Sequence, residues 1–288
     1  MNTRPEISET CVAIVGVGLI GGSIGAALKA NGFAGEIIGC GRNAERLDAA
    51  KSLNLIDTVA TDVASIASRP SFWIFCTPVD MIVDGIRLAA ASSQANSVFT
   101  DAGSTKQQIC EELGAKLGDS IEFVGSHPLA GSEKNGFEYA QADLFENRLC
   151  VTTPADSNSE QATQRVDQFW QALGMRTVST SPSEHDRLLA TTSHLPHVAA
   201  AALASLIDEH NQPFASTGFK DTTRVAGGDP SLWTAILSRN NQHVVEAIHQ
   251  LKQNLTEFEQ AISNNDEAAI NLLLVAGQRG RNMLDHSP

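Results

Sequence analysis

The sequence predicts an α/β fold, in which a Rossmann-like, doubly wound and mostly parallel sheet is followed by an all-α domain. As far as about residue 181, short runs of β-branched and aromatic residues alternate with helix-compatible segments, which is the order of strands joined by crossover helices. Beyond that point the two-residue period is absent, and helical spacing is found at 194–210, 231–240, 242–263 and 267–284. We therefore expect two domains, 1–181 and 182–288.

The first strand leads into the turn Gly16-x-Gly18-x-x-Gly21, and a helix follows as far as residue 31. Gly16 permits the tight turn, Gly18 lets the backbone approach a pyrophosphate, and Gly21 lets the helix pack closely on the strand. The first backbone N–H groups of that helix, at Leu19 and Ile20, would face the anion. This order of strand, turn and helix predicts a dinucleotide-binding site.

The end of the second strand, near residue 40, bears on which dinucleotide binds. In NAD-binding folds an acidic residue there holds the ribose hydroxyls, but this chain has Gly41 followed by Arg42. A missing carboxylate and a nearby guanidinium favour NADP over NAD, while the plainer interpretation of Arg42 is an exposed charge beside a helix cap. Thr77 and Pro78 end the next strong strand, in a loop expected to face the same cofactor.

The rest of the first domain continues the alternation. Strands are expected at 72–76, 97–101, 123–125, 149–154 and 176–179, and helices at 43–53, 79–91, 159–173 and from about 106 to 117. In an open parallel sheet the ligand crevice lies at the carboxyl ends of the strands. The loops after Phe75, Thr100 and Val124 should therefore converge on one cleft.

Two side chains of those loops could carry chemistry. His127 comes just after a predicted strand, and imidazole is the side chain best suited to accept a proton near neutral pH. Ser104 also follows a strand end, where helix capping is the plainer role. His194 and His197 could suit a metal by their spacing, but no further ligand pattern lies nearby, so we expect no metal.

The connection at 216–230 is expected to be a glycine-rich loop between helices. It carries Lys220 and Arg224, and two cations there suit the recognition of a carboxylate. Two exposed charges on a loop are the competing interpretation.

Composition excludes several classes of function. The net charge of −13 argues against binding to nucleic acid or to an anionic membrane, because both need a basic surface. No apolar run approaches about 20 residues and the N-terminus is polar, so we expect a cytoplasmic protein without a membrane span. The five scattered cysteines predict reduced, mostly buried thiols.

Taken together, the motifs at 16–23, 76–78, 101–106, 125–133, 193–197 and 218–224 resemble the prephenate/arogenate dehydrogenase family of tyrosine biosynthesis. The resemblance implies oxidative decarboxylation of prephenate to 4-hydroxyphenylpyruvate, with hydride transfer to NAD(P). It also implies a homodimer formed through the helical domain. The apolar stripe of 242–263 is then either that domain's own core or the subunit interface.

The resemblance also implies roles for particular residues. His127 corresponds to the histidine that hydrogen-bonds the ring hydroxyl, and Ser104 to the serine that aligns it. His197 and Arg224 correspond to substrate-binding positions, with which we group Lys220 and Ser126. Glu133 and Asp186 fall on positions that shape access to the site.

Other functions stay open at this point. Arogenate, or both substrates in a dual cyclohexadienyl dehydrogenase, would give tyrosine directly, although His197 resembles the prephenate-using members. A different dehydrogenase on the same two-domain plan would rely on a lysine or aspartate of the helical region. A non-catalytic NADP sensor would keep the glycine loop alone, and the presence of His127, Ser104 and Arg224 together disfavours it.

Overall fold

The computed structural model describes residues 5–131 and 134–285, and its contacts divide the chain into two compact units, up to Asn240 and from Asn241 onward. The helices between residue 182 and Asn240 group with the sheet in the first unit. The domain boundary expected at 181–182 therefore stays a prediction.

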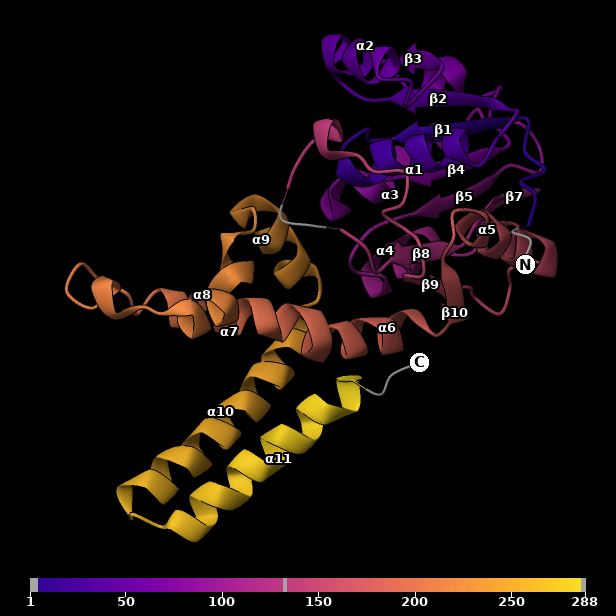
Figure 1. Cartoon of the computed structure of the whole chain (residues 1–288). Helices are drawn as coiled ribbons and strands as arrows, with labels where there is room; N and C mark the ends of the chain where they lie inside the picture. The colour runs from indigo at the N-terminus through magenta and orange to yellow at the C-terminus, as the bar shows by residue number, and fades with distance from the viewer. Residues whose placement is uncertain (1–4, 132–133, 286–288) are drawn as a thin grey trace. The chain divides into compact units, whose positions relative to one another are not determined.

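The first unit is built on a seven-stranded sheet, which confirms the predicted Rossmann-like fold (Figure 1). Its strand order is β3-β2-β1-β4-β5-β7-β6, and all neighbours are parallel except β6 with β7. The strands are β1 (Cys11–Val15), β2 (Glu36–Cys40), β3 (Thr58–Ala60), β4 (Phe72–Phe75), β5 (Val98–Asp101), β6 (Lys116–Gly118) and β7 (Ile121–Phe123).

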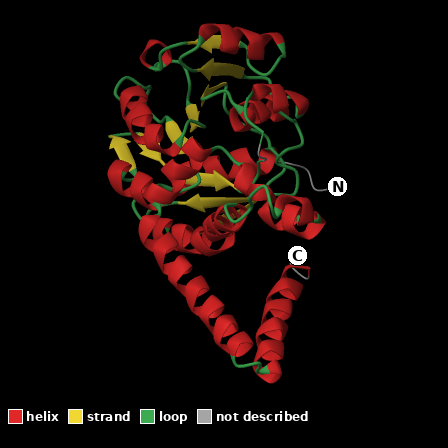
Figure 2. Cartoon of the chain, turned by 90° about the vertical axis from the view of Figure 1, so that its left-hand side faces the viewer, coloured by secondary structure: helices red, strands yellow, loops and turns green. Residues whose placement is uncertain are grey.

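Helices cover both faces of this sheet because both faces are apolar (Figure 2). On β1, Val12 and Ile14 belong to the core that includes residues of α1 (Leu19–Ala30) and α5 (Glu160–Ala172). Ala13 and Val15 belong to the opposite core, with α3 (Ile82–Ala90) and α4 (Gln107–Leu113). The remaining helix of this part is α2 (Ala44–Ser52).

A second, three-stranded sheet has the order β10-β9-β8, and its strands are β8 (Gly125–Pro128), β9 (Leu149–Thr153) and β10 (Arg176–Ser179). The chain leaves the first sheet after Phe123, and β8 pairs antiparallel with β9. His127 was expected in a loop after a strand. It lies inside β8 instead, because residues 125–128 find backbone partners in β9.

The first unit continues in helices that differ in part from the expected ones. They are α6 (Pro182–Leu189), the π-helical turn η4 (Ala190–His194), α7 (Leu195–Ala204), α8 (Thr217–Thr223) and α9 (Pro230–Arg239). Five single 3-10 turns complete the described chain: η1 (Ala64–Ile66), η2 (Val79–Met81), η3 (Phe137–Tyr139), η5 (Gln212–Phe214) and η6 (Arg224–Gly227).

Three expectations for helices and connections of the first unit were wrong. The segment 216–230 is not a loop throughout, since α8 and η6 lie within it. The helix expected at 194–210 ends at Ala204. The helix expected to reach residue 117 ends at Leu113, because Gly114 has a φ of 66° and directs the chain into the edge strand β6.

The second unit is a pair of helices, α10 (Asn241–Ser263) and α11 (Glu267–Asp285), which agree with the predicted segments. Several large apolar side chains of this unit are exposed in the single chain, among them Leu255 at 56% and Leu272 at 70%. Part of the predicted apolar stripe is therefore not covered by any of the residues that the structure describes.

All five cysteines are free, and burial raises the pKa of each thiol. The pKa values of Cys11, Cys40 and Cys110 rise to about 11. In the described part of the chain, none of the helices combines the length and the apolar character that crossing a membrane requires.

Candidate active site

The glycine turn after β1 has the geometry of a dinucleotide-binding loop. Gly16 has a φ of 94°, and a Cβ there would lie 2.8 Å from the backbone of Cys76. A Cβ on Gly21 would lie 2.2 Å from the carbonyl oxygen of Gly16, whereas one on Gly18 would meet no atom of the described residues within 4 Å. Gly16 and Gly21 thus permit tight packing, and the space beside Gly18 is open.

The start of α1 leaves polar groups for an anion. Gly18 is its N-cap, and no side chain caps the helix, so the first N–H groups, including those of Leu19 and Ile20, have no intrahelical partner. The hydroxyl of Thr77, next to Gly16, is buried and finds no hydrogen-bond partner in the described chain. Together with the open space at Gly18, these groups fit the pyrophosphate of a dinucleotide.

Beyond β2 the chain offers no carboxylate at the place where NAD-binding folds carry one. A Cβ on Gly41 would make only ordinary contacts, with Leu47 at 3.7 Å, so a side chain would fit there. Arg42 follows and is exposed. The position is compatible with a phosphate on the ribose.

The loop after β8 lies against the start of α1, since a Cβ on Gly131 would come 4.0 Å from the side chain of Ile20. The same strand contacts the end of β5, because the backbone N–H of Ser126 donates to Asp101 Oδ1 at 3.1 Å. His127 is therefore on a strand that contacts the end of the central sheet and whose following loop contacts the glycine turn's helix.

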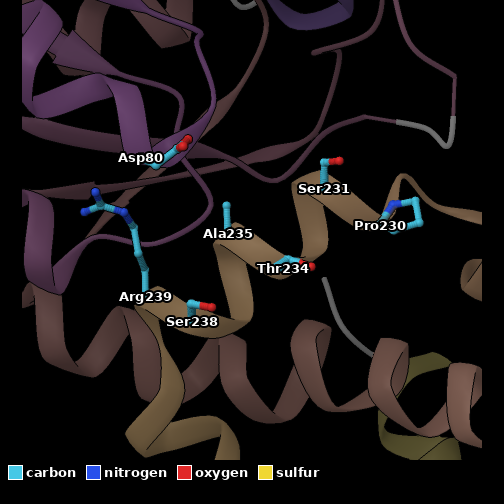
Figure 3. A pocket seen from close by; sticks show the side chains of 7 residues that line it. All are labelled: Asp80, Pro230, Ser231, Thr234, Ala235, Ser238 and Arg239. Atoms are coloured by element: carbon cyan, nitrogen blue, oxygen red, sulfur yellow. The ribbon is translucent and has the colours of Figure 1, made fainter.

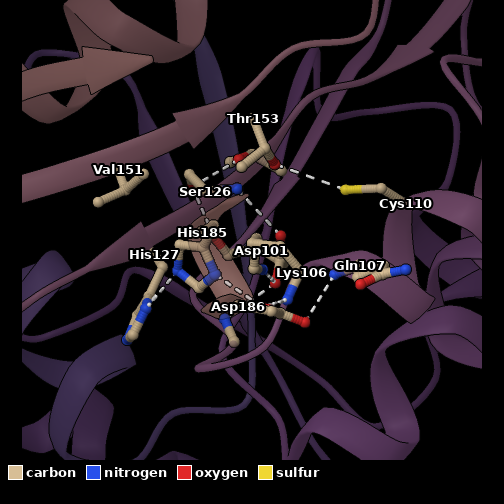
Figure 4. Close-up of polar contacts among 12 residues, drawn as sticks. Asp101, Lys106, Gln107, Cys110, Ser126, His127, Val151, Thr153, His185 and Asp186 are labelled. Atoms are coloured by element: carbon tan, nitrogen blue, oxygen red, sulfur yellow. Dashed lines mark hydrogen bonds and ion pairs between the residues drawn. The ribbon is translucent and has the colours of Figure 1, made fainter. Parts of the chain in front are cut away.

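His127 belongs to a chain of hydrogen bonds with two residues of α6 (Figure 4). Its Nδ1 lies 2.9 Å from Nε2 of His185, and Nδ1 of His185 lies 2.7 Å from Oδ1 of Asp186. Sequence reasoning missed His185. The sequence does mark the start of α6, since Ser181 is its N-cap and accepts a hydrogen bond from the backbone N–H of Glu184, and Pro182 occupies the first turn.

Burial lowers the pKa of His127 well below 6.5, and the neighbouring His185 and Lys106 lower it further. Burial also lowers the pKa of His185, against the opposing effect of its hydrogen bond to Asp186. Both imidazoles are therefore neutral at pH 7, and a neutral imidazole is the form that can accept a proton.

Asp186 is placed differently from the access position that we expected. It is 1% exposed, and its carboxylate accepts hydrogen bonds from the backbone N–H groups of Lys106 at 2.7 Å and Gln107 at 3.0 Å. Its carbonyl oxygen accepts from the side-chain amide of Asn240 at 2.7 Å. These contacts join α6 to α4 and to the end of α9, so we do not retain an access role for Asp186.

Ser126 also differs from expectation. Its side chain is 0% exposed, and its hydroxyl contacts Thr100 at 2.7 Å and Trp170 Nε1 at 2.9 Å, and donates to the carbonyl of Asp101 at 2.5 Å. Beside it Lys106 and Asp101 form a fully buried ion pair. The Ser126 hydroxyl therefore faces the interior, and we leave it out of the proposed substrate contacts.

His197 lies on α7 and stacks on Trp233 of α9, with ring centroids 3.6 Å apart. Its Nδ1 is buried, and no partner for it lies within residues 5–131 and 134–285. His194 donates to or accepts from Asn240 through Nδ1 at 3.0 Å, and burial lowers its pKa to about 4. No three metal-binding side chains come together anywhere in the described ranges.

The other predicted site residues lie as follows. Ser104 is half-buried after β5, and no hydrogen bond joins it to His127 in the part that the structure describes. Lys220 on α8 and Arg224 at the start of η6 are exposed and four residues apart. Glu133 lies outside the described residues.

A cavity of about 520 Å³ lies elsewhere in the first unit, where α9 meets η2 (Figure 3). No residue of the predicted site is among the described residues that line it, which are Asp80, Pro230, Ser231, Thr234, Ala235, Ser238 and Arg239. Cavity volume alone therefore does not locate the chemistry in this molecule.

The fold and this arrangement define a dinucleotide-dependent dehydrogenase of the Rossmann type with a histidine at its centre. Family models match the chain over most of its length: "Prephenate dehydrogenase, nucleotide-binding domain" at residues 24–179 and "Prephenate dehydrogenase, dimerization domain" at 181–275. The chain belongs to the prephenate dehydrogenase family.

Individual relatives agree with this assignment. The chain is 32% identical to a prephenate dehydrogenase of Bacillus subtilis, over 88% of this chain and 71% of the relative. It is 30% identical to a cyclohexadienyl dehydrogenase of Zymomonas mobilis, over 88% of this chain and 89% of the relative. A crystal structure of prephenate dehydrogenase from Aquifex aeolicus, in complex with hydroxyphenyl propionate and NAD+, superposes with a TM-score of 0.89 at 30% identity and covers 99% of both chains.

Proposed function

We propose that this protein catalyses the oxidative decarboxylation of prephenate to 4-hydroxyphenylpyruvate in tyrosine biosynthesis. The observation that carries the proposal is His127, a neutral imidazole on a strand whose following loop contacts the glycine turn's helix, in a chain of this family. Such a base is what removal of a hydroxyl proton requires.

Prephenate carries a hydroxyl at C4 and a carboxylate at C1 of a cyclohexadiene ring. When bound, the nicotinamide accepts the hydride that leaves C4, and aromatisation of the ring drives the loss of CO₂ from C1. Positive charge would build on the C4 oxygen, so acceptance of its proton by His127 is worth about 10²- to 10⁴-fold in rate. Ser104 aligns His127 and the substrate in this proposal.

In this proposal Arg224, Lys220 and His197 bind the carboxylates of the substrate. Arg224 can hold a carboxylate by two parallel hydrogen bonds, which fixes orientation. Its role is mainly orientation, because an ion pair to the C1 carboxylate that tightened in the transition state would oppose the release of CO₂. Lys220, one helical turn before it, adds positive charge.

NADP is the proposed cofactor in preference to NAD. Support comes from the glycine at position 41, which leaves the end of β2 without a carboxylate, and from the exposed guanidinium of Arg42 beside it. Gly16, Gly18, Leu19, Ile20, Gly21, Thr77 and Pro78 would surround the remainder of the dinucleotide.

We further propose that residues 182–288 form the substrate-binding and dimerisation part of the protein, and that the protein is a homodimer. The exposed apolar side chains of α10 and α11 support this, together with the match of residues 181–275 to a dimerization domain.

The function is tested by initial rates of the purified protein with prephenate and with arogenate, each with NAD and NADP. The proposal expects the highest kcat/KM for prephenate with NADP. Preference for arogenate, or comparable rates with both substrates, would replace it with an arogenate or a dual cyclohexadienyl dehydrogenase. Absence of turnover with any combination would contradict the proposed function.

A further inference from the structure

His185 has no assigned role in the proposed reaction, yet both of its ring nitrogens are engaged. It is fully buried on α6, and it lies between His127 at 2.9 Å and Asp186 at 2.7 Å (Figure 4). A histidine between a base and a carboxylate can determine which nitrogen of the base carries a proton.

The direction of these hydrogen bonds follows from Asp186. Its two oxygens accept from the backbone N–H groups of Lys106 and Gln107, and a backbone N–H can only donate. A carboxylate can only accept hydrogen bonds. The contact at 2.7 Å is therefore a hydrogen bond from Nδ1–H of His185 to Asp186.

The direction at His127 then has one solution. A neutral imidazole has one N–H donor and one acceptor nitrogen, so Nε2 of His185 accepts. Nδ1 of His127 must donate to it at 2.9 Å. The proton of His127 is thus on Nδ1, and its Nε2 keeps a free lone pair.

Burial and the charge of Lys106 support the neutral state of both rings. Lys106 is fully buried in its ion pair with Asp101, and its charge lowers the pKa of His127 and of His185. The carboxylates of Asp186 and Asp101 act in the opposite direction on His185, and the burial of its ring outweighs them.

We propose that His185 is a positioning residue that holds His127 as the Nδ1–H tautomer and so presents Nε2 as the proton acceptor. The inference rests on the proposed function, in which His127 accepts the substrate's proton. His185 contacts no substrate in this scheme. Asp186 acts one step further away, by fixing the tautomer of His185 itself.

Nitrogen-15 NMR of the free wild-type protein tests the tautomer directly. At neutral pH we expect His127 to show a protonated Nδ1 and an unprotonated Nε2. The opposite pattern would overturn the inference. Because no substrate is present, this result is independent of turnover, and a protein inactive toward prephenate and arogenate would contradict the proposed function alone.

Two substitutions separate positioning from packing. His185→Asn keeps an amide near Nδ1 to donate to Asp186 but places no acceptor near His127, whereas His185→Gln keeps an acceptor near Nε2. We expect kcat to fall about tenfold or more in the Asn variant, because a tenfold decrease corresponds to the loss of one hydrogen bond. The KM for NADP should be unchanged. The Gln variant should retain most of kcat.

The NMR pattern should change in parallel, with a mixture of His127 tautomers in the Asn variant and the wild-type pattern in the Gln variant. Melting temperatures of both variants report folding. A folded Asn variant with wild-type kcat and the wild-type tautomer would overturn the inference, and so would equal losses of kcat in both folded variants.

Discussion

Asp186 is a single buried carboxylate that joins three segments of the first unit. Its side chain accepts from the start of α4 and from His185, and its backbone accepts from Asn240 at the end of α9. The loss of one buried partner leaves several donors unsatisfied, at about 1 to 3 kcal/mol for each. The stability of this part and the placement of His127 therefore depend on the same residue.

The central prediction at the residue scale concerns His127. His127→Asn should preserve the fold and lower kcat by about 10²-fold or more, since no base remains. The pKa of His127 lies well below 6.5, so in the wild type the base stays neutral, and activity persists, as the pH falls to that pKa. The acidic limb of the wild-type kcat profile should therefore lie below pH 6.5 and be absent in the variant.

The control is His210→Asn, at an exposed histidine outside the proposed site. It should match the wild type in rate and in pH profile. A His127→Asn variant with near wild-type kcat and the same acidic limb would remove His127 from the mechanism.

Arg224→Ala should have a different kinetic effect, because an anion loses an oriented partner while the base remains. We expect the KM for prephenate to rise about 30-fold or more, equivalent to about 2 to 5 kcal/mol for a desolvated pair. Steady-state kinetics of this variant and of Arg176→Ala, an exposed arginine on β10, provide the comparison. Equal KM values in both variants would count against Arg224.

Arg42→Ala should separate the two cofactors. The KM for NADP should rise about tenfold or more, because the variant loses one charge-assisted hydrogen bond to the 2′-phosphate. The KM for NAD should change little. NAD serves as the internal control. An equal increase for both cofactors would contradict the proposed recognition of the 2′-phosphate.

At the scale of elements, we predict different effects of substitution at two glycines, Gly21 and Gly18, near the junction of β1 and α1. Gly21→Ala should lower the melting temperature by several degrees, since its Cβ would lie 2.2 Å from a carbonyl oxygen and overpacking costs about 1 to 3 kcal/mol. Gly18→Ala should leave the melting temperature unchanged and raise the KM for the dinucleotide, because its Cβ enters open space.

Calorimetry and cofactor titration of the two variants distinguish these effects. If Gly18→Ala bound the dinucleotide as well as the wild type, the open space beside Gly18 would not be the pyrophosphate seat.

The elements that the sequence predicted best are those with a strong period and clear ends. The strand, turn and helix around Gly16 and the long helices α10 and α11 were found at nearly their observed bounds. The start of α6 was missed because its apolar positions are few and its signal is a cap, Ser181 followed by Pro182 and Glu184.

The candidate site was only partly predictable for the same reason. His127, Ser104 and the glycines belong to local motifs, whereas the contact of His127 with His185 joins residues 58 positions apart. That contact depends on how α6 packs on α4 and β9, and no local spacing encodes it. Likewise, the burial of Ser126 depends on Trp170 in α5.

For the whole molecule, the exposed apolar side chains of the second unit predict assembly. Light scattering should give twice the 30.6 kDa mass of the chain at micromolar concentration. Leu272→Glu, at a side chain that is 70% exposed in one chain, should weaken the dimer, because a charge would be buried at the interface.

Leu53→Glu is the matched control, since Leu53 is exposed at the end of α2 in the first unit. It should leave the mass unchanged. A monomeric mass for the wild type would contradict the proposed homodimer.

The five cysteines, three buried and two half-buried, have a practical consequence for measurements of cofactor binding and assembly. Thiolate is the form that reacts with maleimides, and the raised pKa of every native thiol leaves very little of it at neutral pH. A cysteine introduced at an exposed position, such as Ser52→Cys on α2, would react far faster than the native ones. A single fluorophore could therefore be attached to the wild-type background, and cofactor binding and subunit exchange could be followed by its emission without first removing any native cysteine.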